Sequence, residues 1–185
     1  LDDYFFKQLA NGGTIKLKYV KSGEVAREVS AEEMLKQIAF GSWRIGDPAV
    51  QYESKIQEMH TCKNSGMIDS SNPCSEYMFL NDTSCNLNSL NLSRFADKEG
   101  NFDVESFLHA TRTMTIAADI ANDAASYPDS TIASISPEFR TIGVGYANLG
   151  TLLMRKGIPY DSNEGRAVAA AITAVMHSEV YKTSA

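Results

Sequence analysis

The apolar positions in the first quarter of the chain follow a helical pattern and then an alternating one. Residues 1–10 carry apolar side chains three or four positions apart and precede a glycine pair, which predicts a helix with a glycine stop. Residues 14–29 alternate on both sides of a Lys-Ser-Gly-Glu turn, as expected of a β-hairpin. Ser30, with Glu33 three positions later, forms a capping box and predicts a helix that ends at Gly46.

Two long helical patterns occupy the C-terminal half. Asp103 is an N-cap residue in front of a stripe of apolar positions spaced by three and four, and Ser162 precedes an alanine-rich stripe of the same kind. Between these two patterns, Ser136-Pro137-Glu138 predicts a helix start with proline in the first turn. Residues 146–156 predict a further helix, which Gly157 terminates.

The short apolar segments complete the predicted fold. Residues 77–80, Tyr-Met-Phe-Leu, are bounded by the turn formers Asn81-Asp82 and predict a buried strand. Trp43 is predicted to be a core residue or a loop anchor. Because long helices alternate with short apolar strands, the pattern predicts an α/β fold.

Composition narrows the class of protein. The chain has 185 residues, of which 43% are hydrophobic and 22% charged, as in a soluble globular protein with room for one core. No apolar run approaches the roughly 20 residues of a membrane span. The start lacks the pattern of a signal peptide, and three cysteines do not form a secreted disulfide framework, so a cytoplasmic location is expected.

Charge and the two chain ends add two further expectations. The net charge is −6 and the basic residues are scattered, which argues against direct binding of nucleic acid. The chain opens on Leu1 and ends at Ala185 without a clear helix stop. We therefore expect an internal piece of a longer protein.

The densest chemistry lies in Asn72-Pro73-Cys74-Ser75-Glu76, which combines an amide, a thiol and an acid. Pro73 fixes its own φ and favours an extended Asn72, which stiffens the loop tip. In an extended stretch alternate residues project to the same side, so Asn72, Cys74 and Glu76 are expected to converge on one ligand. No histidine or cation lies in the segment to activate a thiolate, which favours a neutral thiol suited to hydrogen-atom chemistry.

This segment resembles the finger loop of ribonucleotide reductases. The resemblance extends, in order, over residues 46–52, 60–62, 72–80, 83–87, 89–92 and 140–150. It is closest to the adenosylcobalamin-dependent (class II) ribonucleoside-diphosphate reductase, because of the Asn72-Pro73 pairing and the eleven-residue step from Cys74 to Cys85. It implies that residues 1–185 form part of a ten-stranded α/β barrel, a partial catalytic domain, with Cys74 on a finger loop inside it. The segments 46–48 and 50–52 would lie on the approach to the active site.

The resemblance also implies a role for each site residue in the reduction of ribonucleotides to 2′-deoxyribonucleotides for DNA synthesis. Cys74 would form the thiyl radical that takes the 3′ hydrogen of the ribose. Glu76 would accept the proton of the 3′ hydroxyl, and Asn72 would hydrogen-bond the sugar hydroxyls. Cys85 would be half of the redox pair that ends as a disulfide. The substrate-binding residues would be Asn72, Pro73, Cys74, Ser75 and Glu76.

The implied cofactor is adenosylcobalamin, and no residue is expected to bind a metal ion directly. The implied partners are a ribonucleotide substrate, nucleotide effectors, a thioredoxin-type reductant and a second copy of the complete enzyme in a homodimer. No cobalamin-binding motif is present in the chain, so the cofactor rests on the resemblance. The sequence leaves open whether the substrate is a diphosphate or a triphosphate.

Three other interpretations compete. The first is a class I large subunit, which uses a separate metal-containing radical partner. The second is a structural zinc site, whose candidate ligands are His60, Cys62, Cys74 and Cys85, although no CxxC is present and Cys62 is predicted to be structural. The third is a catalytically inactive scaffolding piece. Gly143-Val144-Gly145 lacks the third glycine of a dinucleotide-binding motif and is predicted to allow close packing instead.

Overall fold

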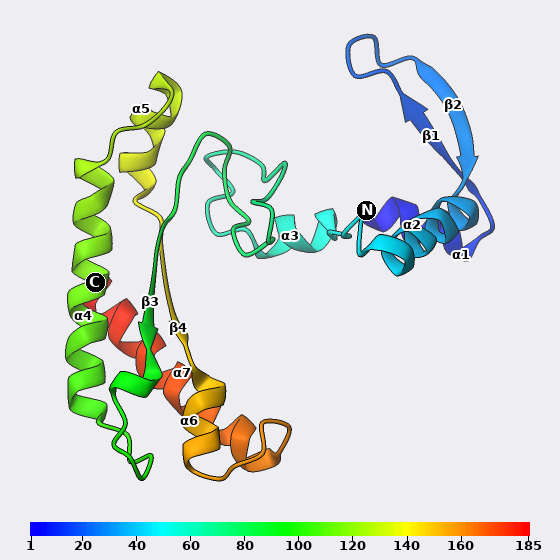
Figure 1. Ribbon diagram of the computed structural model, residues 1–185. Coiled ribbons are helices and arrows are strands. Elements are labelled where there is room, and N and C mark those ends of the chain that lie inside the picture. Colours follow the sequence, from blue (N-terminus) through cyan, green and yellow to red (C-terminus); the bar gives the residue numbers. More distant parts are fainter. The chain divides into compact units, whose positions relative to one another are not determined.

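The chain divides into two compact units. In the computed structural model, which describes all of residues 1–185, unit 1 comprises Leu1–Asn81 and unit 2 comprises Asp82–Ala185 (Figure 1). None of the helices combines the length and the apolar composition that crossing a lipid bilayer requires.

Unit 1 begins with helix α1 (Asp3–Ala10) and a two-stranded hairpin. Strands β1 (Thr14–Lys18) and β2 (Val25–Ser30) are antiparallel, with Thr14 opposite Ser30, which confirms the predicted hairpin. Helices α2 (Ala31–Ile45) and α3 (Glu53–Met59) follow. The predicted start and end of α2 are confirmed: the Ser30 side chain accepts a hydrogen bond from the Glu33 N–H, and Gly46 has a φ of 76°.

The packing in unit 1 corrects the prediction for Trp43. The few buried apolar residues of the unit are Phe5, Ala31, Ile68 and Leu80. The Trp43 side chain is 80% exposed, and its ring contacts that of Phe40, with 5.8 Å between the ring centroids. The side of α2 that is turned inward carries Ala31 and the half-buried Ile38. Because Trp43 follows Ile38 by five positions, it lies on a different side of the helix.

The buried strand predicted for residues 77–80 is also wrong. Only Met78 makes a β-bridge, an isolated antiparallel one to Ser71. A strand belongs to a ladder along its length, and residues 77–80 belong to neither of the two sheets. The run is nonetheless largely sheltered, since its last residue, Leu80, is buried.

Unit 2 is built on a parallel pair of strands. Strand β3 (Asn86–Asn91) is followed by the short 3-10 helix η1 (Leu92–Arg94), helix α4 (Val104–Ala124) and helix α5 (Ser130–Phe139). Strand β4 (Ile142–Ala147) then pairs in parallel with β3, with Asn86 opposite Ile142. Helices α6 (Leu149–Arg155) and α7 (Asn163–Ser184) complete the unit. The β3–α4–α5–β4 crossover confirms the α/β class.

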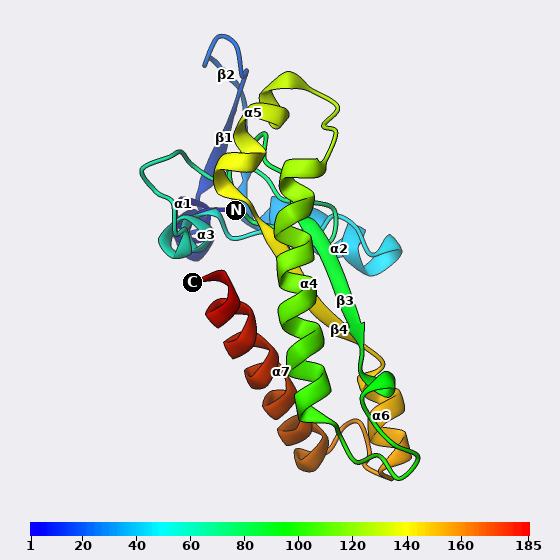
Figure 2. The ribbon, with the colours of Figure 1, turned by 90° about the vertical axis from the view of Figure 1, so that its left-hand side faces the viewer.

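The core of unit 2 lies where α4 and α7 pack on each other and on one face of the strand pair (Figure 2). Its buried apolar members are Leu90, Leu92, Phe107, Leu152, Ile172 and Met176. The rings of Phe95 and Phe102 both meet the fully buried Phe107 edge-on, at centroid distances of 5.3 and 5.1 Å. These contacts fix the first turns of α4 against the segment that follows β3.

The helix starts of unit 2 confirm two predictions and correct two. Asp103 and Ser162 cap α4 and α7 as predicted, through hydrogen bonds from the N–H groups of Ser106 and Gly165. The helix start predicted at residues 136–138 is wrong: α5 begins after Asp129, which caps it, and Pro137 lies inside its last turns. Residues 142–147 form β4, so the helix predicted from residue 146 begins only at Leu149. Pairing with β3 decides the conformation of this segment.

An arginine connects the end of α5 to α4 just before β4. Arg140 adopts a left-handed conformation with φ of 51°, donates from Nε to Asp119 (2.8 Å) and makes two bonds to Asp123 (2.7 and 2.9 Å). Its hydrogen bonds with Asp123 and Asp119 raise the pKa of the guanidinium above its ordinary value. These bonds fix the point at which the chain enters β4.

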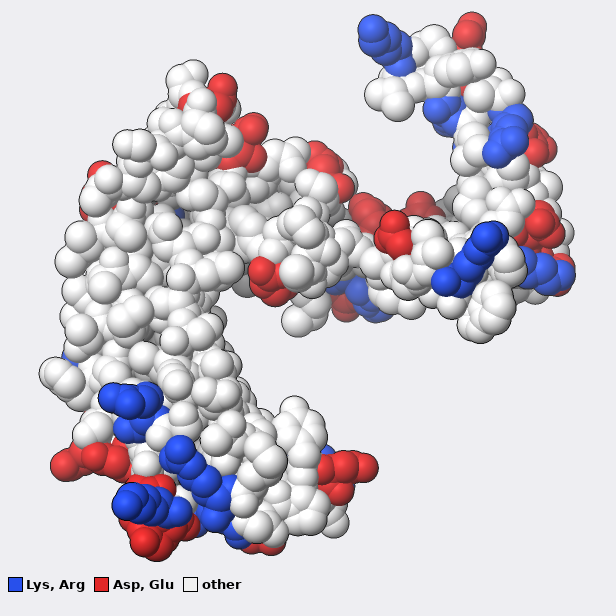
Figure 3. Space-filling view, viewed as in Figure 1, with Lys and Arg blue, Asp and Glu red and all other residues white.

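In unit 2, charged side chains of both signs gather at the end that carries α6, whereas the middle of the face visible in Figure 3 is mostly uncharged. Several of the cations are in ion pairs, including Lys16 with Glu28 and Arg166 with Asp161. At the α6 end of unit 2, a cavity of about 490 Å³ is lined by Arg94, Lys98 and Arg155 together with Asp97.

Candidate functional site

The segment with the candidate chemistry forms a β-turn. The Ser75 N–H donates to the Asn72 carbonyl over 3.1 Å, which closes a four-residue turn with Pro73 second and Cys74 third. The fixed φ of proline suits the second position of such a turn. Ser75 then has a φ of 63°, in the left-handed region that non-glycine residues seldom occupy. Cys74 is therefore held at the tip of a reversal of the chain.

This turn overturns the predicted same-side arrangement of residues 72, 74 and 76. That arrangement requires an extended backbone, and the left-handed Ser75 interrupts it. The Asn72 side chain stabilises the reversal, because its Oδ1 accepts the Tyr77 N–H over 3.0 Å. The loop tip predicted at Pro73 and Cys74 is present, and a turn and the Asn72 side chain give it its shape.

The three side chains differ in exposure. Cys74 and Glu76 are exposed, whereas Asn72 is half-buried. The Asn72 Oδ1 is engaged with the backbone, so the Nδ2 hydrogens are the part of this side chain available for a ligand. The tip thus offers a thiol, a carboxylate and an amide donor within five residues.

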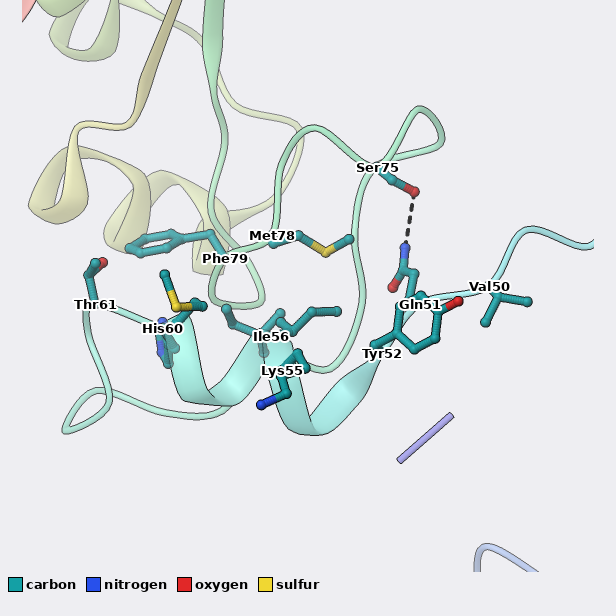
Figure 4. Close-up of a pocket in the computed structure, with 12 residues that line it drawn as sticks. Val50, Gln51, Tyr52, Lys55, Ile56, His60, Thr61, Ser75, Met78 and Phe79 are labelled. Carbon is teal, nitrogen blue, oxygen red and sulfur yellow. Dashed lines mark hydrogen bonds between the residues drawn. The ribbon is translucent and has the colours of Figure 1, made fainter. Parts of the chain in front are cut away.

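A cavity of about 510 Å³ adjoins the turn, and most of its lining residues lie outside the five-residue motif. Its walls come from the segment 50–52, from α3 and the residues just after it, and from Ile68, Ser75, Met78 and Phe79 (Figure 4). Ser75 is the only member of the five-residue motif that lines it. Lys55 is its one cationic wall residue, and a hydrogen bond with Glu58 raises the pKa of this lysine.

Two polar side chains hold the preceding loop near α3. Gln57 bonds the backbone of Ile68 in both directions: its Nε2 donates to the carbonyl over 2.6 Å, and its Oε1 accepts the N–H over 3.3 Å. The buried His60 accepts the Cys62 N–H at Nδ1, and its Nε2 then donates to the Gly66 carbonyl over 3.1 Å. This ring meets Phe79 edge-on, at a centroid distance of 6.0 Å.

Cys85 belongs to unit 2 and directly precedes β3. Along β3 the even-numbered residues are more buried, and Asn88 donates to the Met114 carbonyl of α4. The odd-numbered residues Leu87 and Ser89 lie on the other face. A Cβ added at Gly143 would lie 3.7 Å from the Cys85 sulfur and 2.4 Å from a Leu87 methyl, so Cys85 is on this second face. The predicted close packing at Gly143 is confirmed.

The candidate zinc ligands do not form a cluster. No group of three or more His, Cys, Asp or Glu side chains gathers as a metal site in the chain. Cys62, Cys74 and Cys85 are not in disulfides. The backbone N–H of Cys62 bonds to the His60 ring, and the structural role of its thiol stays a prediction.

The sequence did not reveal the side chain that connects to both sides of the turn. Gln51 donates from Nε2 to the hydroxyls of Ser71 and Ser75. The resemblance assigned the segment 50–52 to the approach to the active site, but no local pattern links a glutamine to serines 20 and 24 positions away. Only the fold brings them together.

The comparisons with known proteins agree on one family. The family model described as ribonucleotide reductase, barrel domain, matches residues 8–185. The chain is 51% identical over 155 residues to a vitamin B12-dependent ribonucleotide reductase of Rhodopirellula baltica, covering 84% of this chain and 15% of that protein. Proteins of the same name from Bradyrhizobium diazoefficiens and Streptomyces avermitilis are 45% and 44% identical over the whole chain, covering 15% and 20% of their lengths.

The chain thus spans a fifth or less of the length of these relatives. The family model nevertheless covers nearly all of it, including the turn at residues 72–75 and the parallel strand pair. The chain therefore belongs to the ribonucleotide reductase barrel-domain family.

Proposed function

We propose that the complete polypeptide to which this chain belongs reduces ribonucleotides to 2′-deoxyribonucleotides with adenosylcobalamin as cofactor. Residues 1–185 then contribute a finger loop and part of a ten-stranded α/β barrel to its catalytic domain. The observation that carries the proposal is the exposed Cys74 at the tip of a stiffened turn, with Asn72 and Glu76 beside it, in a chain of this family. The names of the relatives support the cofactor.

The residues of the turn fit a radical-generating cofactor. When bound, adenosylcobalamin supplies an organic radical, which is chemistry that side chains lack. The chain's part is to present a thiol that can give up a hydrogen atom. Cys74 is exposed at the tip of the turn, within reach of a large molecule, and the motif contains no cation that would favour the thiolate.

Each side chain of the turn has one task in the proposed reaction. The Cys74 thiyl takes the 3′ hydrogen atom of the ribose. The exposed Glu76 carboxylate accepts the proton of the 3′ hydroxyl. The Asn72 Nδ2 donates to a sugar hydroxyl, since its Oδ1 is bonded to the Tyr77 N–H. Backbone from Asn72 to Glu76, including Pro73 and Ser75, lines the substrate site.

The 2′ hydroxyl then leaves as water and must be replaced by hydrogen. Cys85 and a second cysteine from another part of the polypeptide supply two electrons and two protons, and they end as a disulfide. The position of Cys85 supports this role, because its sulfur lies on the face of the strand pair opposite α4. At the end of the cycle the Cys74 thiol returns the 3′ hydrogen atom to the sugar radical and becomes a thiyl again. A thioredoxin-type reductant would then reduce the disulfide.

The remaining partners are those expected of the complete enzyme. We propose a ribonucleoside diphosphate as substrate, nucleotide effectors, a homodimer and a cytoplasmic location. The class I alternative predicts instead that activity requires a separate metal-bearing protein. The scaffolding alternative predicts no activity under either condition.

Replacement of Cys74 tests the proposal in the complete polypeptide. Cys74→Ser removes the hydrogen-atom donor but keeps the size of the side chain, so turnover should fall below detection while ribonucleotide binding changes less than about threefold. Cys62→Ser, at a cysteine without a proposed catalytic role, is the matched control and should retain turnover. Turnover by Cys74→Ser at the wild-type rate would rule out Cys74 as the radical site.

A further inference from the structure

One glutamine connects both sides of the Cys74 turn to the segment before α3. Gln51 Nε2 lies within hydrogen-bond distance of the Ser71 hydroxyl. It is also 3.1 Å from the Ser75 hydroxyl, the contact drawn in Figure 4. Ser71 precedes the turn and Ser75 is its last residue, so Cys74 lies between the two contacts. We call Gln51, Ser71 and Ser75 the amide clamp.

The direction of these bonds follows from Ser71. Its hydroxyl donates its single proton to the Asn72 carbonyl over 2.8 Å, so it can only accept from Gln51. This places the Nε2 group, with its two hydrogens, toward the serines, one hydrogen for each hydroxyl. A methionine has the same length but no donor, and it would lose both bonds.

The clamp holds a residue whose backbone conformation is unfavourable. Ser75 has a φ of 63°, which glycine adopts freely and serine does not. The Ser75 N–H is bonded to the Asn72 carbonyl and its hydroxyl to Gln51, so these two groups oppose a return to an ordinary conformation. The left-handed serine is thus held by contacts outside its own backbone.

Gln51 is itself anchored on helical structure. The adjacent Tyr52 stacks on the Phe6 ring of α1, with 5.9 Å between the ring centroids. The next residue, Glu53, begins α3, and its N–H donates to the Leu1 carbonyl over 2.9 Å. The clamp therefore connects the turn to α1 and α3 through one side chain.

We propose that Gln51 is a positioning residue for Cys74, an inference that rests on the proposed function. Its two bonds hold the turn so that the Cys74 sulfur meets the ribose at reacting distance. Gln51 itself touches neither the substrate nor the reacting atoms. Loss of the clamp should therefore slow the reaction by misplacing the thiol and leave substrate binding nearly unchanged.

The test compares three variants of the complete polypeptide with one control. Gln51→Met removes both bonds, Ser75→Ala removes one hydroxyl, and the third variant combines the two. Gln37→Met is the matched control, because Gln37 on α2 is exposed and its amide bonds only the Glu33 side chain of the same helix. Hydrogen–deuterium exchange of residues 71–78 reports on the turn without cofactor or substrate, and steady-state kinetics report on the reaction.

We expect exchange of residues 71–78 to become about five to ten times faster in Gln51→Met, since two hydrogen bonds are lost. The kcat should fall about 10- to 100-fold, with a change in KM of less than about threefold. The double variant should be no worse than the poorer single variant, because both substitutions break the same clamp. Gln37→Met should match the wild type in both measurements.

Unchanged exchange in Gln51→Met would overturn the clamp, and faster exchange with an unchanged kcat would overturn its role in positioning. Additive effects of Gln51→Met and Ser75→Ala on exchange in the double variant would also overturn the clamp, because the two residues would then act independently. Failure of the proposed function is distinguishable, since it requires a wild-type polypeptide that reduces no ribonucleotide. That result would overturn the assignment of Gln51 to radical chemistry. The exchange data would still test whether Gln51 restrains residues 71–78.

Discussion

The two units keep their candidate site residues in place by different means. In unit 2, Cys85 directly precedes a strand whose inner face packs under Phe107, Ile172 and Met176, so apolar burial holds the backbone around it. In unit 1, the Cys74 turn has little apolar core beneath it and depends on polar side chains. Hydrogen bonds to loop backbone or hydroxyl groups come from the side chains of Gln51, Gln57, His60 and Asn72.

Because the two units use different contacts, substitutions in them should affect different properties of the protein. Apolar burial is distributed over many contacts and responds to lost volume, whereas a polar clamp depends on one or two directional bonds. Changes in unit 2 should therefore act mainly on the free energy of unfolding. Changes around the turn should act mainly on turnover.

The largest effect on unfolding is expected from the core of unit 2. Phe107→Ala removes a fully buried ring that meets Phe95 and Phe102 edge-on, so the free energy of unfolding should fall by about 3–5 kcal/mol. Trp43→Ala on α2 is the contrasting change in unit 1. This ring is 80% exposed, and its loss should cost about 0.5 kcal/mol or less. Urea denaturation measures both, and equal losses would remove the distinction between the units.

A smaller effect on the free energy of unfolding should distinguish substitutions at two glycines of β4. Gly143→Ala places a methyl 2.4 Å from Leu87 Cδ2, and the exposed Leu87 side chain must move, at a cost of about 1 kcal/mol. Gly145→Ala meets only ordinary contacts, the nearest being Ser89 Oγ at 3.6 Å. Both variants restrict the unfolded chain equally, so the difference in their unfolding free energies isolates the Leu87 contact. No difference between them would contradict close packing beside Cys85.

The smallest effect is a dependence on pH at the start of α4. Hydrogen bonds from the Ser106 hydroxyl and N–H lower the pKa of Asp103 below its ordinary value. The charged Asp103 cap therefore stabilises the fold fully above the pKa that this carboxyl has in the unfolded chain, about 4. This stabilisation is lost as the pH falls through the lower pKa of Asp103 in the folded chain. Asp103→Ser keeps a cap that does not titrate. The stability advantage of the wild type over this variant should shrink between pH 6 and pH 3, and an advantage independent of pH would refute the charged cap.

Local chemistry predicted much of the fold. The caps Ser30, Asp103 and Ser162 and the glycine stop at Gly46 occur where the sequence placed them, because each depends on residues within one turn of the helix. Strands β3 and β4 were missed. Asn-Leu-Asn-Ser-Leu-Asn and Ile-Gly-Val-Gly-Tyr-Ala are weak strand formers, and pairing across more than 50 residues decides their conformation.

For the candidate site too, the sequence predicted some features and missed those that depend on tertiary contacts. The resemblance identified Asn72, Cys74, Glu76 and Cys85, whose proposed roles the experiments above examine. The geometry of the turn was predicted wrongly, because the left-handed Ser75 cannot be inferred from a serine in the sequence. The contacts of Gln51 depend on tertiary structure and have no local signal.

The most direct test of the central claim is electron paramagnetic resonance on the complete polypeptide, frozen during turnover with adenosylcobalamin, a ribonucleotide and a dithiol. We predict a cysteine-centred signal that narrows when the protein carries β-deuterated cysteine and that is absent in Cys74→Ser. A signal that is unaffected by the deuterium and persists in Cys74→Ser would contradict Cys74 as the radical site.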